Sequence, residues 1–529
     1  ANDAITFNHT IDGGQALTLV SGTAATTISG DIGAGTALTG LTITNGTANG
    51  TITFGGNIGD GSGAGVTGVT AVGNTNTADL NFNSTIYSFD GATTITAASG
   101  DTIDIAAGAA TTFTTAADNI TFATGNIELA NGSNLTVDTG ATGGNITIGE
   151  IAGTSVETVT LDAGTGTTSV GVIGSGTEIG VLSIGSAQNG AITLNGAITT
   201  DGSVTIDGPV TLATGAISVT TANDAITFNH TIDGGQALTL VSGTAATAIQ
   251  GEIGGNTAIS SLTITNGTAN GTIEISNIGG VTGATAIGNT NTGTITLDGT
   301  AYTTTGTQTY TAAAGQNIDI TGAATFTTTN SNIAFNTSGV DLANNGTTTI
   351  NTGAGAGTVT FGAAIEGNSA TAPFNDLLVI TSGTGNVTFT GAIGATNALG
   401  GLTVNGTSGD GDITFTSTIG DTGNAGVVGT TSIGNTSTAD LNFNSITYSF
   451  DGATTITAAS GDTIDIAAGA STTFTTAADN ITFATGNIEL TDGSNLIVDT
   501  GAAAGNITIG EIDGHSVETV TLDAGTGTT

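Results

Sequence analysis

The sequence predicts an all-β fold, a parallel β-helix (β-solenoid) built from stacked turns. Short runs alternate apolar residues with Thr, Asn, Asp or Glu, as in NITF (119–122) and TVTL (158–161). This alternation places one face of a strand in a core and the other in water. Long segments also recur, as in repeat arrays. β-Branched residues and turn formers dominate, and the 529 residues include only two prolines, which favours strands joined by turns.

The repeats divide the chain into units. Residues 78–168 return 361 positions later as residues 439–529, and ten of the 91 paired positions differ. Residues 1–26 return as residues 222–247. Gly-x-Ile-Gly phrases mark the unit starts. We expect one continuous β-solenoid over residues 1–529, a window of a longer array, with a long unit at 30–170, a short unit at 171–250, a long unit at 251–390 and a partial long unit at 391–529.

One stretch shows the expected size of a turn. From Val181 the pattern advances in three segments of nearly equal length, 181–202, 203–224 and 225–247, each with two or three short strands. Stacking such turns about 4.8 Å apart pairs each strand with the turns above and below. A string of tandem β-sandwich domains is the alternative, but such domains have longer strands and more Pro in their linkers.

The charge balance excludes several classes of partner. The chain has no Lys or Arg and a formal net charge of −41. Nucleic acids and anionic membranes are therefore not expected partners, because both are bound through basic residues. We find no apolar run of the roughly 18 residues that suggest a membrane span. Without Cys there are no disulfides or thiolate metal sites.

Paired carboxylates are the first candidate site. Asp101 and Asp104 recur as Asp462 and Asp465, and acid–base hydrolysis of glycans uses two carboxylates. Residues 286–353 are a diverged copy of residues 71–140, and in this diverged copy Gln316 takes the place of Asp101 while Asp319 is kept. Asp104 also lies between Ile103 and Ile105, so it faces away from the core. We interpret these residues as a solvated strand face and expect no enzyme activity and no catalytic residues.

Histidine and calcium are the remaining ion-binding candidates. His9 and His230 occupy one repeat position, and His515 replaces Thr154 of the other copy, so no transition-metal site is expected. Asp lies beside Gly in three turns, where Ca²⁺ would find oxygen ligands. None matches the EF-hand or nonapeptide calcium motifs. Calcium remains open and its ligands unknown; the turns are IGDGSGAG (58–65), SGDGDITF (408–415) and TIDGGQAL (10–17).

Three other residue patterns have structural interpretations. Thr pairs (Thr42 with Thr44, Thr112 with Thr114, and the run 303–311) suggest an ice-binding ladder, but their irregular spacing argues against one. Chance explains the Asn-x-Ser/Thr sequons in so Asn- and Thr-rich a chain. The tyrosines are expected in the core or capping a turn. The sequons are at Asn45, Asn83, Asn119, Asn134 and Asn145, and the tyrosines are Tyr87, Tyr302, Tyr310 and Tyr448.

Three phrases resemble a known group of proteins: GNVTFTGAIGATNALGGLTV (385–404), DAITFNHTIDGGQALTLVSGT (3–23) and GNIELANGSNLTVDTG (125–140). They are similar to the β-strand repeats of giant secreted bacterial surface proteins, the filamentous-haemagglutinin-like adhesins and related extracellular matrix proteins. The resemblance covers essentially the whole chain. It implies a right-handed β-helix displayed or released at the cell surface, and it carries no functional residues across.

We therefore expect a non-enzymatic extracellular structural protein of a bacterial surface filament, sheath or adhesive fibre. Near-identical units favour self-association into filaments or end-to-end contacts, because they repeat one contact. The first alternative is a carbohydrate-binding or carbohydrate-cleaving β-helix, or a host-binding adhesin displayed as an individual rod, with a polysaccharide as partner. The second is a calcium- or ice-responsive module, which a ladder of Thr or Asp at one fixed position of every turn would favour.

Overall fold

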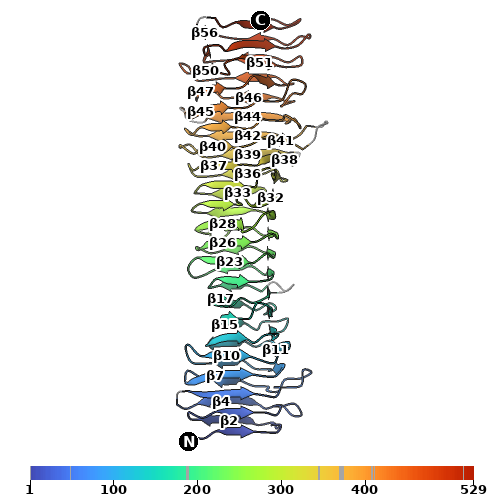
Figure 1. Cartoon of the computed structure of the whole chain (residues 1–529), viewed down its shortest axis with the longest axis vertical. Coiled ribbons are helices and arrows are strands. Elements are labelled where there is room, and N and C mark those ends of the chain that lie inside the picture. The colour runs from blue at the N-terminus through green and yellow to red at the C-terminus, as the bar shows by residue number, and fades with distance from the viewer. Residues whose placement is uncertain are drawn as a thin grey trace. The chain divides into compact units, whose positions relative to one another are not determined.

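The computed structural model is all-β. It describes residues 2–47, 49–185, 190–343, 346–368, 374–406, 409, 411–515 and 517–529. Within these ranges every regular element is a strand, and no helix occurs. The chain divides into two compact units, Ala1–Gly251 (unit 1) and Glu252–Thr529 (unit 2). In each unit short strands from successive turns lie above one another (Figure 1).

In unit 1 each turn contributes strands to three columns, in the order A, B, C. Two longer strands, β15 (Ile146–Ala152) and β17 (Thr168–Ile173), turn the corner from column C to column A. Column A contains β1 (Ile5–Phe7), β3 (Thr26–Ile28), β5 (Gly50–Phe54), β7 (Thr77–Phe82), β10 (Thr102–Ile105), β13 (Asn126–Leu129), β20 (Ile198–Thr200), β23 (Ile217–Thr221) and β26 (Ala237–Ser242). Column B contains β8 (Ile86–Ser88), β11 (Thr111–Thr114), β14 (Leu135–Asp138), β16 (Thr158–Asp162), β18 (Val181–Gly185), β21 (Val204–Asp207), β24 (Ile226–Phe228) and β27 (Thr247–Ile249). Column C contains β2 (Ala16–Ser21), β4 (Gly40–Asn45), β6 (Thr70–Gly73), β9 (Thr93–Thr96), β12 (Ile120–Thr124), β19 (Ile192–Leu194), β22 (Val210–Leu212) and β25 (Ile232–Asp233).

Unit 2 has three columns of its own, named D, E and F in chain order. Column D contains β28 (Ser261–Asn266), β31 (Thr285–Ile287), β34 (Gln308–Thr311), β37 (Ile333–Asn336), β40 (Val359–Phe361), β43 (Val387–Phe389), β45 (Gly411–Phe415), β47 (Thr438–Phe443), β50 (Thr463–Ile466), β53 (Asn487–Leu490) and β56 (Ile512–Gly514). Column E contains β29 (Gly271–Ile275), β32 (Thr292–Leu297), β35 (Asn317–Ile320), β38 (Gly339–Leu342), β41 (Ile365–Gly367), β48 (Thr447–Ser449), β51 (Ser471–Thr475), β54 (Asn495–Asp499) and β57 (Val520–Asp523). Column F contains β30 (Ile278–Val281), β33 (Ala301–Thr304), β36 (Thr325–Thr327), β39 (Thr347–Asn351), β42 (Leu377–Ser382), β44 (Gly401–Gly406), β46 (Thr431–Ile433), β49 (Thr454–Ile456), β52 (Ile481–Phe483) and β55 (Ile507–Thr508).

The strand pairing confirms the predicted β-solenoid, and the β-sandwich alternative is wrong. Neighbouring strands in a column are parallel and belong to successive turns, for example Leu182 with Val204 and Val204 with Ile226. These pairs step by the same interval as the segments that begin at Val181, which confirms the turn size predicted for this stretch. Elsewhere turns are longer, as in the step from Ile103 to Ile127. The fold therefore has about 21 turns. If every turn were as short as those in the stretch from Val181, the chain would form more turns than this.

The core follows from the alternation within each strand. Buried and outward residues alternate in β14 and β45, for instance, and the buried ones are mostly Ile, Val, Leu and Phe. Unit 2 also contains a ladder of five phenylalanines in column D. Their rings stack nearly parallel, with interplanar angles of 5–7° and centroids 4.9–5.4 Å apart. The ladder consists of Phe335, Phe361, Phe389, Phe415 and Phe443.

The four tyrosines are core residues, as predicted, and each side chain is 0% exposed. Their hydroxyl groups are satisfied by hydrogen bonds. The Tyr87 hydroxyl accepts one from the Ser84 amide at 2.9 Å, and the Tyr310 hydroxyl donates to Gln308 Oε1 at 3.1 Å. Burial raises the pKa of Tyr87 well above its ordinary value, so these phenols stay protonated.

The copied segments of unit 1 do not return to the same column. β1 lies in column A, whereas its copy β24 lies in column B. Nine pairing steps lead along column A from β1 to β23, and β24 follows β23 one column later. The separation of the two copies thus corresponds to nine and one third turns. The copy at residues 222–247 is therefore rotated by one face relative to residues 1–26.

Candidate binding groove and threonine rows

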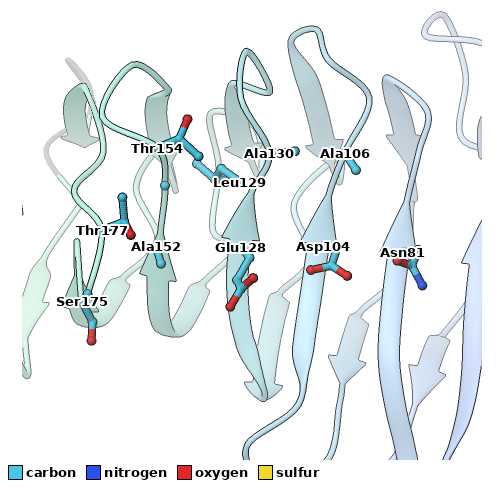
Figure 2. Close-up of a pocket in the computed structure, with 12 residues that line it drawn as sticks. Asn81, Asp104, Ala106, Glu128, Leu129, Ala130, Ala152, Thr154, Ser175 and Thr177 are labelled. Carbon is cyan, nitrogen blue, oxygen red and sulfur yellow. The ribbon is translucent and has the colours of Figure 1, made fainter.

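A groove of about 550 Å³ lies on unit 1. Figure 2 shows the side chains of Asn81, Asp104 and Glu128 side by side along one wall. The other residues that line it are small or carry hydroxyl groups, apart from one leucine: Ala106, Leu129, Ala130, Ala152, Gly153, Thr154, Ser175, Gly176 and Thr177. One wall of the groove therefore carries polar side chains, and most of its other lining residues are small.

The polar wall is a consequence of strand register in column A. Asn81 pairs with Asp104, Asp104 with Glu128, and Glu128 with Ala152, so all four point outward from successive turns. In-register residues of parallel strands are about 4.8 Å apart. Burial raises the pKa of the Asp104 carboxyl against a hydrogen bond from Thr102, and the negative charge of Asp79 raises it further. The groove thus places one amide beside two carboxyl groups.

The predicted pair Asp101–Asp104 is not the pair that the fold brings together at this site. Asp101 precedes β10 and does not line the groove, whereas Glu128, one turn away, lies beside Asp104. The second copy repeats this wall with Asn442, Asp465 and Glu489. Sequence reasoning missed Glu128, although its offset from Asp104 along the chain equals one turn.

A second residue that the sequence analysis missed is Glu157, which supports the groove's other wall. Its side chain is 0% exposed. Its carboxylate accepts hydrogen bonds from the Thr154 amide (2.6 Å), the Thr154 hydroxyl and the Gly132 amide (3.3 Å). Burial acts to raise the pKa of Glu157, but the hydrogen bonds from Thr154 and from the Glu157 and Gly132 amides together outweigh it and lower the pKa. The Glu157 side chain is therefore an ionised carboxylate, and its hydrogen bonds hold the loop that carries Thr154 in place.

The two copies of the duplicated segment differ at the groove. Three of the ten differing positions line it: Ala130, Ala152 and Thr154 correspond to Thr491, Asp513 and His515. Asp513 continues the acidic column, since it pairs with Glu489. The residues that complete the groove, 175–177, follow the duplicated segment. At these three positions the first copy thus has smaller side chains than the second copy, and it lacks the carboxylate of Asp513.

A further acidic column of three residues begins in the diverged copy on unit 2. Asp319, Asp341 and Glu366 are in register on β35, β38 and β41. Burial raises the pKa of each of the three carboxyls. The negative charge of Asp341 adds to the shifts of Asp319 and Glu366, while the Asn317 amide donates to Asp341 and opposes its shift.

The turns proposed for calcium use their carboxylates within the protein. Asp60 Oδ1 accepts from the Ser62 amide, the Ser62 hydroxyl and the Gly63 amide at 2.8–2.9 Å, and the Ser62 amide contributes most to its lowered pKa. Asp12 Oδ1 accepts from the amides of Gly35 and Thr36 in the next turn. These aspartates close turns and connect them. In the turn 408–415, Ser408 and Asp410 lie outside the described residues.

The histidines do not gather into a site. His230 Nε2 lies 3.3 Å from Asp207 Oδ1, whereas His9 lies elsewhere in unit 1 and His515 lies in unit 2. Among the residues that the structure describes, no group of three or more His, Asp or Glu side chains is placed to hold a metal ion.

Several sequon asparagines have structural roles. Asn45 is fully buried and donates to Ser21 Oγ at 2.8 Å. Asn119, Asn134 and Asn145 each accept from a backbone amide one turn later, at 2.8–2.9 Å. Asn83 is exposed. These contacts explain why Asn is frequent at the corners of the solenoid.

The structure corrects the prediction about threonine ladders, because an outward row does exist. In column C nine successive turns place these residues in register: Thr18, Thr42, Ala71, Thr94, Thr121, Thr147, Ser169, Thr193 and Thr211. We call this set the threonine row. The step along the chain is shortest from Thr193 to Thr211 and longest from Thr42 to Ala71, because the corner loops differ in length while the strands stay aligned. A constant sequence offset was therefore the wrong criterion.

Comparison with known proteins adds no relative. No family model, curated protein or solved structure matches the chain. No helix long and apolar enough to cross a membrane occurs in the described ranges. The fold and its register define the class of protein, a β-solenoid repeat protein.

Proposed function

We propose that the chain is a non-enzymatic extracellular structural protein, the repeat portion of a bacterial surface filament, sheath or adhesive fibre. The observation that carries this proposal is the faithful repetition of packed turns. Strands β7 and β47 occupy equivalent positions in the two copies of the duplicated segment and have the same burial pattern. A surface that recurs in this way offers the same contact repeatedly to other copies of the chain.

The acidic surface suggests how such contacts are controlled. The formal net charge is −41 and no Lys or Arg is present, so copies repel one another unless cations screen the carboxylates. Calcium would favour association by bridging carboxylates of neighbouring chains. The proposal therefore assigns any calcium to contacts between molecules.

Electron microscopy of the purified protein, with and without a calcium chelator, tests this proposal. We expect long uniform fibres whose axial repeat is about 4.8 Å, the spacing of paired strands. Loss of the fibres on chelation would assign calcium to the contacts, whereas chelator-resistant fibres would remove it from the proposal. Dispersed single particles under both conditions would contradict the filament.

The groove favours a second candidate function, binding of a carbohydrate by an individually displayed adhesin. Asn81 supplies donors and an acceptor, and Asp104 and Glu128 supply acceptors for sugar hydroxyl groups. Small lining residues, Ala130 and, next to Glu128 on the polar wall, Ala152, leave room for a ring. This candidate accounts for the concentration of copy differences at the groove.

A glycan array followed by calorimetry tests the carbohydrate candidate. We expect the double variant Asp104→Ala, Glu128→Ala to bind the selected glycan at least roughly tenfold more weakly, since each hydrogen bond to a charged group is worth about 1.5–3 kcal/mol. The control is Asp465→Ala, Glu489→Ala in the second copy, which should leave binding unchanged. If no glycan is retained, or if both variants weaken binding equally, this candidate is wrong.

A further inference from the structure

We propose that the threonine row of unit 1 binds the surface of ice, and that the corresponding row in column F of unit 2 does so in its own right. The unit 2 row includes Thr455, Thr482 and Thr508, the copies of Thr94, Thr121 and Thr147. This function is independent of the filament and of the groove, because the row lies on column C and the polar wall of the groove on column A.

The row is a regular array of hydroxyl and methyl groups. Each member points outward from its strand and is exposed or half-buried. The pairing fixes their separation at about 4.8 Å per turn. This is close to the repeat of oxygen rows on a prism face of ice. Because threonine is β-branched, its χ1 angle is restricted, so the array is rigid before it meets its ligand.

The hydroxyl groups of the row are available to water. Ser169 Oγ accepts a hydrogen bond from Asn195 Nδ2 at 3.0 Å. The threonine hydroxyls of the row form no hydrogen bond within the described part of the chain. Each can therefore donate to and accept from ordered water molecules, while its methyl group rests against the lattice.

The row is also free of charge, which an ice surface requires because a charged side chain keeps its own hydration shell. Column B offers the contrast. It holds a second row of Thr and Ser, but Asp138, Asp162 and Asp207 lie two residues from its members Thr136, Thr160 and Thr205 on the same strands and the same face. Although 41 acidic residues are spread over the chain, none occurs at these nine positions. The next position in register after Thr211 is Asp233, which ends the uncharged face.

The two copies of the duplicated segment differ at one position of the column B row and at no position of the threonine row. Thr94, Thr121 and Thr147 are all kept as Thr in the second copy, whereas Thr136 of the column B row is replaced by Ile497. The other two column B positions of the duplicated segment, Thr112 and Thr160, are kept as Thr473 and Thr521. Column B, whose threonines are in register but lie beside aspartates, supplies a matched control for the threonine row.

Ice recrystallisation in the presence of the full chain is the test. We expect the unaltered protein to keep ice grains small, and the variant carrying T94L, T121L, T147L, T455L, T482L and T508L to lose this effect. The control variant carries six Leu substitutions on columns B and E, at Thr112, Thr160, Thr205, Thr227, Thr473 and Thr521, and should behave as the unaltered protein. Circular dichroism establishes that all three remain folded.

Two results would overturn the proposal. One is grain growth equal to buffer alone with the unaltered protein; the other is equal loss of activity in the two variants. If the first is accompanied by a change in sedimentation for the threonine-row variant alone, the face serves contacts between copies of the chain. Fibre formation is measured separately, so failure of the filament proposal would leave this result unaffected.

Discussion

Phe389→Ala is expected to destabilise the turns in the middle of unit 2. Phe389 is 1% exposed, and its ring stacks on Phe361 and Phe415 with centroids 5.4 and 4.9 Å away. Replacing a buried phenylalanine by alanine costs about 3–5 kcal/mol through lost transfer free energy and the cavity left behind. Each turn of a solenoid is stabilised mainly by its neighbours. The loss should therefore concentrate in the turns around β40, β43 and β45.

Hydrogen exchange resolved along the chain measures this effect. We expect faster exchange of backbone amides around residues 359–415 and little change in unit 1. Thr388→Ala is the control, because Thr388 precedes Phe389 on the same strand but is half-buried and faces outward. An unchanged exchange pattern in Phe389→Ala, or an equal effect of the control, would show that the phenylalanine ladder does not hold these turns together.

Acidification is expected to stabilise the part of unit 2 that contains the acidic column Asp319, Asp341 and Glu366. Burial raises the pKa of all three carboxyls in the folded state, so the folded protein binds protons more tightly than the unfolded chain. Their contribution to stability is fully present below the unfolded-state pKa and is lost as the pH rises through the raised values. Lowering the pH from about 8 to about 4, the ordinary range of carboxyl pKa values, should therefore raise the melting temperature of this region.

Calorimetric melting at these two pH values, on the unaltered chain and on Asp341→Asn, measures the effect. The variant removes one charge from the centre of the column, so it should melt higher at the upper pH and depend less on pH. Asp421→Asn is the contrasting control. Hydrogen bonds from Gly423 and Asn424 lower the pKa of Asp421, so its loss should not reduce the pH dependence in this way. A melting temperature that falls on acidification would contradict this account of the column.

The sequence contains the information for the strands but not for their alignment. Alternation in runs such as NITF (119–122) predicted the buried and outward positions, and the evenly spaced stretch from Val181 predicted the turn size. The phenylalanine ladder was not predicted, because its members are spaced unevenly by corner loops of different length. The same unevenness concealed the threonine row and the pairing of Asp104 with Glu128.

Glu157 was missed for a different reason. In a strand-like pattern a glutamate is read as one more outward residue, whereas here it is buried and hydrogen-bonded to its own loop. The available signal was its position three residues after Thr154, the spacing at which a hydroxyl residue and a glutamate cap each other at helix starts. In this chain the same spacing closes a corner of the solenoid.

The rotation of repeated segments by one face has a consequence for crowding. Because a motif in unit 1 recurs nine and one third turns later, the two occurrences point in different directions. A bulky molecule bound to the first occurrence therefore leaves the second occurrence accessible. A flat surface that carries many receptors cannot bind both occurrences from one side. Avidity depends on whether sites can be occupied together. Within unit 1, copying this segment thus placed its two occurrences on different faces of the solenoid.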